Sequence, residues 1–409
     1  MNKFLKEFKD RGFFYQCTNE DELSKILDKE KINGYIGFDC TAESLHVGSL
    51  LQIMCLRLLQ KHGHRPIVLL GGGTTRIGDP SGKDKTRTIL NEEEIEKNIK
   101  NIEKILKNFL DTKDPKTKPI FVNNYSWLKN LNYISFLRDI GKHFTINKML
   151  SFDSVKTRLE REQSLSYMEF NYMILQAYDF LELNKKENCV LQMGGSDQWG
   201  NIVNGVDLVK RHSNKQTYGL TTPLITLASG TKMGKTESGA VWLDKKFLSA
   251  YDYWQFWRNI DDRDVLKFLK IFTDLSIDDI EKGKSQDINQ QKITLANNAT
   301  SMLHGEQEAK ASEETAKKTF SENSLGSELP SVLINKDQLD KNLNIIDLII
   351  LSKLESSKSE IRRLIKGKGV KINNRMVDDE KLIIIKKLFK DNCIKISLGK
   401  KRHIKVELT

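Results

Sequence analysis

The sequence has few cysteines, and none of them form a metal-binding or redox pair. The five cysteines are Cys17, Cys40, Cys55, Cys189 and Cys393. No two of them have C-x-x-C spacing, and their odd number argues against a full disulfide framework, so a reducing cytoplasm is the simplest setting. The seven histidines are scattered, and the neighbours His62 and His64 have no acidic or cysteine partner nearby. We therefore expect no metal site built from protein side chains.

Long apolar runs are absent as well. No segment approaches the roughly 20 apolar residues that a membrane-spanning helix needs, so we expect no membrane segment. The N-terminal stretch MNKFLKEFKDRGFF mixes acidic and basic side chains and lacks the apolar core of a signal peptide.

The phosphate-binding pattern G-x-x-x-x-G-K-[ST] does not occur, which argues against a kinase-like ATP enzyme. No Ser/His/Asp or Cys/His grouping indicates a protein nucleophile.

Strand-like and helix-like runs alternate in the first half of the chain. Residues 33–39, 65–73 and 188–195 predict strands, whereas 46–62 and 91–110 predict helices. This alternation predicts an α/β fold, with a mostly parallel sheet and helices on both faces. The 409 residues suggest two to four domains at roughly 100–200 residues each.

The pattern changes after the α/β half. We expect a catalytic-type α/β domain over 1–246, an α-helical domain over 247–320, a polar linker over 321–339 and a small α+β module over 340–409. From Ser356 to Thr409 there are 16 Lys and Arg against 6 Asp and Glu, a net of +10, which leaves +1 for the rest of the chain. A small basic module is typical of nucleic-acid binding, and its apolar positions and turn glycines argue against a merely solvated tail.

Two stretches suggest phosphate binding. SLHVGSLLQI (44–53) places small and polar residues before an apolar helix-like run, and the free N–H groups of such a helix start favour an anion. Taken alone, an ordinary helix start with His46 as a packing or capping residue fits at least as well. In TKMGKTESG (231–239), Lys232 and Lys235 suit a polyphosphate, although a surface turn is the simpler interpretation of that stretch in isolation.

Two further stretches follow predicted strands and contain glycine. In GGGTTRIGDPSGKDKTR, the glycines let a ligand approach the backbone, Asp79 can bind an ammonium group, and Lys83 and Arg87 can bind phosphates. In LQMGGSDQWGN, Asp197 lies at a strand-to-helix corner, where a carboxylate can accept hydrogen bonds from a ribose. Ligands bind beyond the carboxyl ends of parallel strands, and the glycine-rich strand ends at 71–73 and 194–195 fit that rule.

Together these motifs resemble a known family. LHVGS resembles the HIGH motif of class I aminoacyl-tRNA synthetases, and KMGKT resembles their KMSKS loop. YIGFDCTAESLHVG, IGDPSGK, YMILQAYDF and GGSDQWGN, in this order, resemble the bacterial-type tyrosyl-tRNA synthetases over nearly the whole chain. The C-terminal region resembles an RNA-binding domain shared with a ribosomal small-subunit protein. The chain departs from the motifs at Ser49, where the family has a second histidine, and at Gly234 and Thr236.

The resemblance implies a Rossmann-like nucleotide-binding fold and a two-step reaction. L-Tyrosine and ATP, which enters with Mg²⁺, form tyrosyl-adenylate and pyrophosphate, and the tyrosyl group then passes to the 3′-terminal adenosine of tRNA(Tyr). The substrate carboxylate is the nucleophile, so catalysis consists of positioning and charge stabilisation. A non-catalytic RNA-binding protein on the same fold is the competing class.

The resemblance also assigns site residues. Catalytic roles are implied for His46, Lys83, Arg87, Lys232 and Lys235. ATP binding is implied for Gly37, Asp39, Thr41, His46, Gly48, Ser49, Gly195, Asp197, Lys232 and Lys235. Tyrosine binding is implied for Tyr35, Asp79, Tyr172, Gln176, Asp179, Gln192 and Gln198. Among these, Tyr35 and Asp179 resemble the pair that binds the substrate phenol.

The family resemblance and the charge distribution also predict the binding partners, tRNA and a second copy of the chain. Five bases in a short span that predicts a helix and a glycine turn are expected to bind tRNA, namely Arg362, Arg363, Lys366, Lys368 and Lys371. FLRDIGKHFTINKML (136–150) resembles the subunit contact of the family, so we expect a homodimer. Phe144, Ile146 and Met149 are expected to supply its apolar surface.

Overall fold

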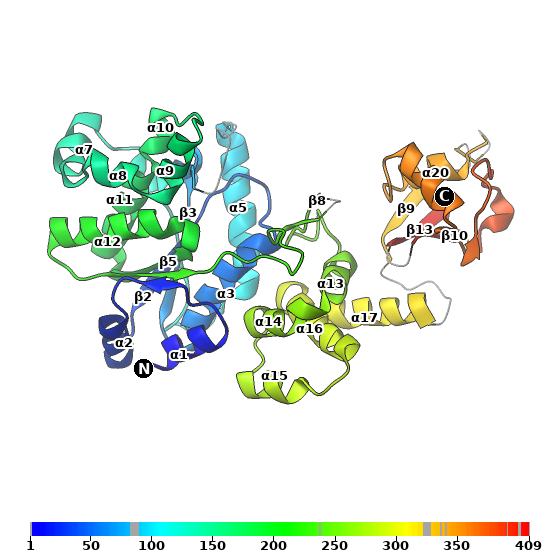
Figure 1. Ribbon diagram of the computed structural model, residues 1–409, viewed down its shortest axis with the longest axis horizontal. Coiled ribbons are helices and arrows are strands. Elements are labelled where there is room, and N and C mark those ends of the chain that lie inside the picture. The colour runs from blue at the N-terminus through cyan, green and yellow to red at the C-terminus, as the bar shows by residue number, and fades with distance from the viewer. Residues whose placement is uncertain are drawn as a thin grey trace.

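The computed structural model describes residues 2–81, 90–236, 239–321, 329–335, 338–339, 342–390, 392–399 and 402–408. In chain order, the described residues form an α/β unit, a helical unit and a C-terminal unit with its own sheet (Figure 1). None of the helices in these ranges is long and apolar enough to cross a membrane.

A six-stranded sheet is the centre of the α/β unit, with the strand order β1-β6-β5-β2-β3-β4. Its strands are β1 (Gln16–Cys17), β2 (Asn33–Phe38), β3 (Arg65–Leu70), β4 (Ile120–Asn123), β5 (Cys189–Gly195) and β6 (Tyr218–Thr222). All neighbours pair in parallel except β1, which is antiparallel to β6. The three predicted strands are confirmed as β2, β3 and β5. The chain runs outward in both directions from β2, so the sheet has a topological switch point between β2 and β5.

Helices cover both faces of this sheet (Figure 1). They are α1 (Lys3–Asp10), α2 (Glu20–Lys29), α3 (Val47–Lys61), α4 (Gly72–Thr75), α5 (Glu92–Phe109), α6 (Tyr125–Leu128), α7 (Tyr133–Asp139), α8 (Ile146–Leu150), α9 (Asp153–Glu160), α10 (Tyr167–Phe170), α11 (Tyr172–Glu187) and α12 (Trp199–Ser213), with short 3-10 turns η1 (Gly141–His143) and η2 (Ser196–Gln198). The helices expected over 46–62 and 91–110 are confirmed as α3 and α5. Helix α5 begins with a capping box between Asn91 and Glu94.

Side chains of the central strands alternate between two hydrophobic cores, as the two-residue repeat of a strand requires. Ile36 and Val68 lie in the core that also contains apolar residues of α1, α3 and α5. Tyr35 and Ile67, one position earlier in each strand, lie in the core formed with α11 and α12. The predicted α/β fold with helices on both faces is therefore confirmed.

The helical unit packs directly on the α/β unit. It comprises α13 (Ala250–Arg258), α14 (Asp262–Phe272), α15 (Ile277–Gly283), α16 (Ile288–His304) and α17 (Glu306–Ser321). Its apolar residues belong to the same core as α3. The buried Arg11 donates hydrogen bonds to the carbonyl oxygens of Lys270, Thr273 and Leu275, which lie at the end of α14 and just beyond it.

The C-terminal unit has a separate core. Its sheet has the order β11-β10-β12-β13-β9, from β9 (Ser331–Ile334), β10 (Val370–Ile372), β11 (Arg375–Met376), β12 (Cys393–Leu398) and β13 (Arg402–Leu408). The described part of this unit also contains the helices α19 (Ile345–Leu351) and α20 (Lys358–Lys366) and the turn η3 (Lys386–Leu388). Strand β9 falls inside the segment 321–339 that the sequence predicted as linker, yet it pairs in parallel with β13. The C-terminal sheet therefore begins before residue 340.

Candidate active site

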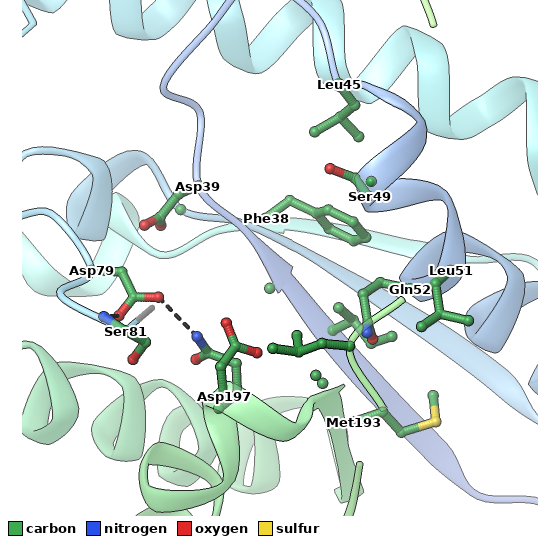
Figure 2. A pocket seen from close by; sticks show the side chains of 18 of the residues that line it. Phe38, Asp39, Leu45, Ser49, Leu51, Gln52, Asp79, Ser81, Met193 and Asp197 are labelled. Atoms are coloured by element: carbon green, nitrogen blue, oxygen red, sulfur yellow. Dashed lines mark hydrogen bonds between the residues drawn. The ribbon is translucent and has the colours of Figure 1, made fainter. Parts of the chain in front are cut away.

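A cavity of about 430 Å³ opens beyond the carboxyl ends of β2, β3 and β5, at the switch point of the sheet. Most residues that the sequence pointed to line it: Tyr35, Gly37, Asp39, His46, Gly48, Ser49, Asp79, Tyr172, Gln176, Asp179, Gln192, Gly195, Asp197, Gln198 and Lys232. Figure 2 shows the carboxylates of Asp39, Asp79 and Asp197 around the cavity, with Ser49 across from them at the start of α3. Motifs nearly 200 residues apart in the sequence thus meet at one site.

Four expected residues are not placed in this cavity. Thr41 is exposed and does not belong to the lining. Lys83 and Arg87 lie outside the described residues. Lys235 lies in the strand β7 (Lys235–Thr236), which pairs with β8 (Gly239–Ala240), but its side chain is outside the described part of the structure.

His46 caps the start of α3. Its Nδ1 accepts a hydrogen bond from the backbone N–H of Gly48 at 3.0 Å. A ring nitrogen that accepts carries no proton, so the neutral imidazole carries its proton on Nε2 and donates from there. The side chain is thereby held at a helix N-terminus as a hydrogen-bond donor, which suits an anionic group.

The segment around residues 231–243 packs on the same helix start. The N–H of Val47 donates to the carbonyl of Val241, and the N–H of Leu243 donates to the carbonyl of Leu45, both at 2.9 Å. The N–H of Val241 also donates to the carbonyl of Gly234 at 3.2 Å, which joins this segment to the loop that contains Lys232, a residue of the cavity lining. The two phosphate-binding candidates of the sequence are therefore in direct contact.

Two glycines make this contact possible. A Cβ at Gly48 would lie 2.6 Å from Cε1 of His46 and 2.9 Å from the carbonyl oxygen of Met233. Gly234 has φ +118°, and a Cβ there would lie 2.8 Å from Nδ1 of His46. Both positions exclude larger residues because the two motifs approach so closely.

Buried polar groups concentrate at the other end of the cavity. The Asp179 carboxylate accepts hydrogen bonds from Nδ2 of Asn124 at 2.9 Å and Nε1 of Trp127 at 2.8 Å. Burial raises the pKa of Asp179 to about 7, although those two hydrogen bonds lower it. The hydroxyl of Tyr35 and Oε1 of Gln192 are buried without a hydrogen-bond partner in the described ranges. Buried polar atoms are normally paired, so these two are suited to a polar ligand.

A second cluster of polar side chains, also at the cavity wall, is joined by hydrogen bonds. Nε2 of Gln198 donates to Asp79 at 2.8 Å. Nδ2 of Asn201 donates to Oε1 of both Gln176 and Gln198, each at 3.0 Å. These bonds fix the orientation of both glutamine amides, so that the carboxylate of Asp79 and the two amides surround one part of the cavity wall.

Several site residues were missed by the sequence analysis. Asn124 and Trp127 follow β4, a four-residue strand that the sequence did not reveal, so nothing in the sequence marked them as residues at a strand end. Thr74 and Asn201 lie inside motifs that the sequence did identify. Gln52, also in such a motif, lines the cavity and donates to Oγ1 of Thr222 at 2.9 Å.

The fold and the site define a class of protein. Residues 27–321 match the family described as tRNA synthetases class I (W and Y), and residues 346–384 match the S4 domain. The chain is therefore a class I tRNA synthetase. Its characteristic features are the helix start capped by a histidine, the lysine-containing loop packed on it and the parallel sheet beneath.

Comparison with individual proteins narrows the class. A tyrosine–tRNA ligase of Pelagibacter ubique is 82% identical over 408 residues and covers 100% of both chains. One from Rickettsia felis is 52% identical, over 99% of this chain and 100% of that one. A C-terminally truncated mitochondrial tyrosyl-tRNA synthetase of Aspergillus nidulans has a TM-score of 0.70 at 31% identity, over 78% of this chain and 94% of that chain. The chain belongs to the tyrosine–tRNA ligase family.

Proposed function

We infer that the protein activates L-tyrosine with ATP and transfers the tyrosyl group to the 3′-terminal adenosine of tRNA(Tyr). One observation carries this proposal. A single cavity holds buried, unpaired polar atoms beside Asp179 at one end and a helix start with His46 and Lys232 at the other. The first end suits a phenol in an apolar wall, and the second suits phosphates.

In the first step, a carboxylate oxygen of tyrosine attacks the α-phosphorus of ATP. The new O–P bond forms as the bond to the β-phosphate bridging oxygen breaks, which releases pyrophosphate. No protein nucleophile takes part. Nε2–H of His46, the positive end of the α3 dipole and the ammonium of Lys232 stabilise the charge that develops on the phosphates. Mg²⁺ enters with ATP, and Lys83, Arg87 and Lys235 are proposed to hold the leaving pyrophosphate.

The amino acid is proposed to lie with its ammonium group near Asp79, Tyr172 and Gln176. Its phenol then reaches Tyr35 and Asp179. A pocket that hydrogen-bonds a hydroxyl rejects the analogue without it, because its own polar groups are left unpaired. This family is itself the standard example of that principle.

The decisive test is tyrosine-dependent exchange of labelled pyrophosphate into ATP, measured beside tryptophan and phenylalanine. We expect exchange with tyrosine and little with the other two. Binding of RNA without any exchange would instead support the non-catalytic class.

The C-terminal unit is proposed to hold tRNA. Arg362, Arg363 and Lys366 lie on α20, Lys368 follows it, and Lys371 lies on β10, all five exposed. Such a row can follow a phosphate backbone, so affinity for tRNA should fall steeply as salt rises. Because tRNA charging takes place where tRNA is used, we place the protein in the cytoplasm.

A homodimer is proposed through the helices α7 and α8. The structure changes which residues can form the contact, because Met149 is buried and Phe144 is half-buried in the core. Ile134 and Ile146 are instead 70% and 60% exposed. We expect a dimer by sedimentation at micromolar concentration and a shift to monomer in Ile134→Asp. A monomeric parent protein would contradict the proposal.

A further inference from the structure

A ring of hydrogen bonds joins three strand ends to α11. Nδ2 of Asn124, after β4, donates to Asp179 at 2.9 Å and to Oγ1 of Thr74 at 3.1 Å. Oγ1 of Thr74, in the turn after β3, donates to Oδ1 of Asp39 at 2.9 Å. Asp39, after β2, accepts at Oδ2 from the hydroxyl of Tyr172 at 3.0 Å. Because Tyr172 and Asp179 both lie on α11, the helix closes the ring.

The direction of each bond in this ring is fixed. The hydroxyl of Thr74 has one proton and gives it to a carboxylate, so it can only accept from Asn124. Oδ1 of Asn124 accepts from the N–H of Gly73 at 2.7 Å, so both of its amide protons remain for Thr74 and Asp179. Thr74, Asn124 and Asp179 are each at most 3% exposed. Directional hydrogen bonds through these buried side chains therefore connect the carboxylates of Asp39 and Asp179.

The backbone at Gly71 is shaped around this ring. A Cβ at Gly71 would lie 2.4 Å from Oδ1 of Asp39 and 2.5 Å from Oγ1 of Thr74. It would enter the bond between them. Gly71 lines the cavity, as the sequence led us to expect of the glycines at 71–73, and it also leaves room for the hydrogen bond between Thr74 and Asp39.

We propose that Thr74 is a positioning residue that couples recognition of the substrate phenol at Asp179 to the placement of Asp39, and through it to nucleotide binding. The proposal rests on the proposed function, which puts the phenol at Asp179 and the nucleotide beyond Asp39. A phenol that donates to Asp179 changes the strength of the hydrogen bond that this carboxylate accepts from Asn124. Asn124 then binds Thr74 differently, and Thr74 adjusts its bond to Asp39. An amino acid without the hydroxyl does not donate to Asp179, so the hydrogen bonds of Asn124 and Thr74 stay as they are in the free protein.

The test compares ATP binding in two ternary complexes that do not react. Tyrosinol and phenylalaninol lack the carboxylate nucleophile, so the dissociation constant of Mg–ATP can be measured at equilibrium with either one saturating. In the parent protein we expect ATP to bind about fivefold more tightly with tyrosinol, at the lower end of usual couplings between sites. In Thr74→Val, which keeps the shape but has no hydroxyl, the two constants should become equal.

Control variants separate coupling from folding. Thr74→Ser keeps the hydroxyl and should keep the fivefold ratio, whereas Thr74→Cys, with a weak donor, should give an intermediate one. Thr75→Val is the matched control, because Oγ1 of Thr75 accepts from the N–H of Cys40 at 2.7 Å in the same turn but lies outside the ring. It should lower the melting temperature and retain the ratio.

The outcomes are distinct. A fivefold ratio that persists in Thr74→Val, or is absent from the parent, overturns the coupling. If Thr74→Val does not fold, the Ser and Cys variants decide, and equal ratios in both would count against the proposal. Failure of the parent to bind tyrosinol and to exchange pyrophosphate would instead overturn the proposed function itself.

Discussion

Tyrosine binding should weaken as the pH falls below 7, because the substrate phenol needs the ionised carboxylate of Asp179 as its acceptor. Burial raises the pKa of this carboxyl from 3.8 to about 7 in the free protein. At that pKa about ten elevenths of the molecules are ionised at pH 8 and about one eleventh at pH 6. The dissociation constant for tyrosine should therefore rise about tenfold between pH 8 and pH 6.

The assay is equilibrium binding of tyrosine from pH 5.5 to pH 8.5, with phenylalanine as the matched ligand. Phenylalanine shares every ionisable group with tyrosine in this range and lacks only the hydroxyl, so its affinity should stay nearly flat. Asn124→Ala removes a hydrogen bond that lowers the pKa of Asp179. A hydrogen bond to a charged group contributes about 1.5 kcal/mol, so the acid limb should move up by about one pH unit. Asp179→Asn should bind weakly at every pH. A tyrosine affinity that is constant from pH 8 to pH 6 would refute the assignment.

Three further predictions concern other parts of the chain. Lys235→Ala should slow adenylate formation in pre-steady-state measurements and leave tyrosine affinity nearly unchanged, because its charge is needed only as pyrophosphate leaves. Gly234→Ala should slow activation far more than Gly230→Ala, since both have positive φ but only the former places a Cβ against His46. A chain ending at about residue 325 should exchange pyrophosphate at a near-normal rate and charge tRNA poorly, and equal losses in both assays would show that the C-terminal unit supports the catalytic fold.

The parts of the fold that the sequence revealed are those with a strong local pattern. Strands β2, β3 and β5 lie in the middle of the sheet and are apolar runs that end near glycine or Asp. Helix α5 has isoleucines at helical spacing and an asparagine cap. The shorter strands β4 and β9 were missed, because four residues carry too little periodicity to stand out from their polar surroundings.

The site residues likewise fall into those that the sequence revealed and those that only the structure shows. The cavity residues lie within motifs, and their residue types already indicated phosphate, ammonium and phenol binding. Asn124 and Trp127 act through Asp179. A contact between segments so far apart in the chain produces no recognisable motif or spacing in the sequence. The closeness of Gly71 to this network was not visible for the same reason, since only the structure shows how near its backbone lies to Asp39.

The backbone bond between Leu45 and Leu243 also bears on the order in which the protein can form during synthesis. Nearly 200 residues separate the two ends of this bond. At about 5–20 residues per second, roughly 10–40 s pass between their synthesis. Throughout that interval α3 lacks the segment that packs on its first turn. A released chain that ends at about residue 225 should therefore hold its parallel sheet yet fail to retain ATP, which ATP binding to chains of increasing length can measure.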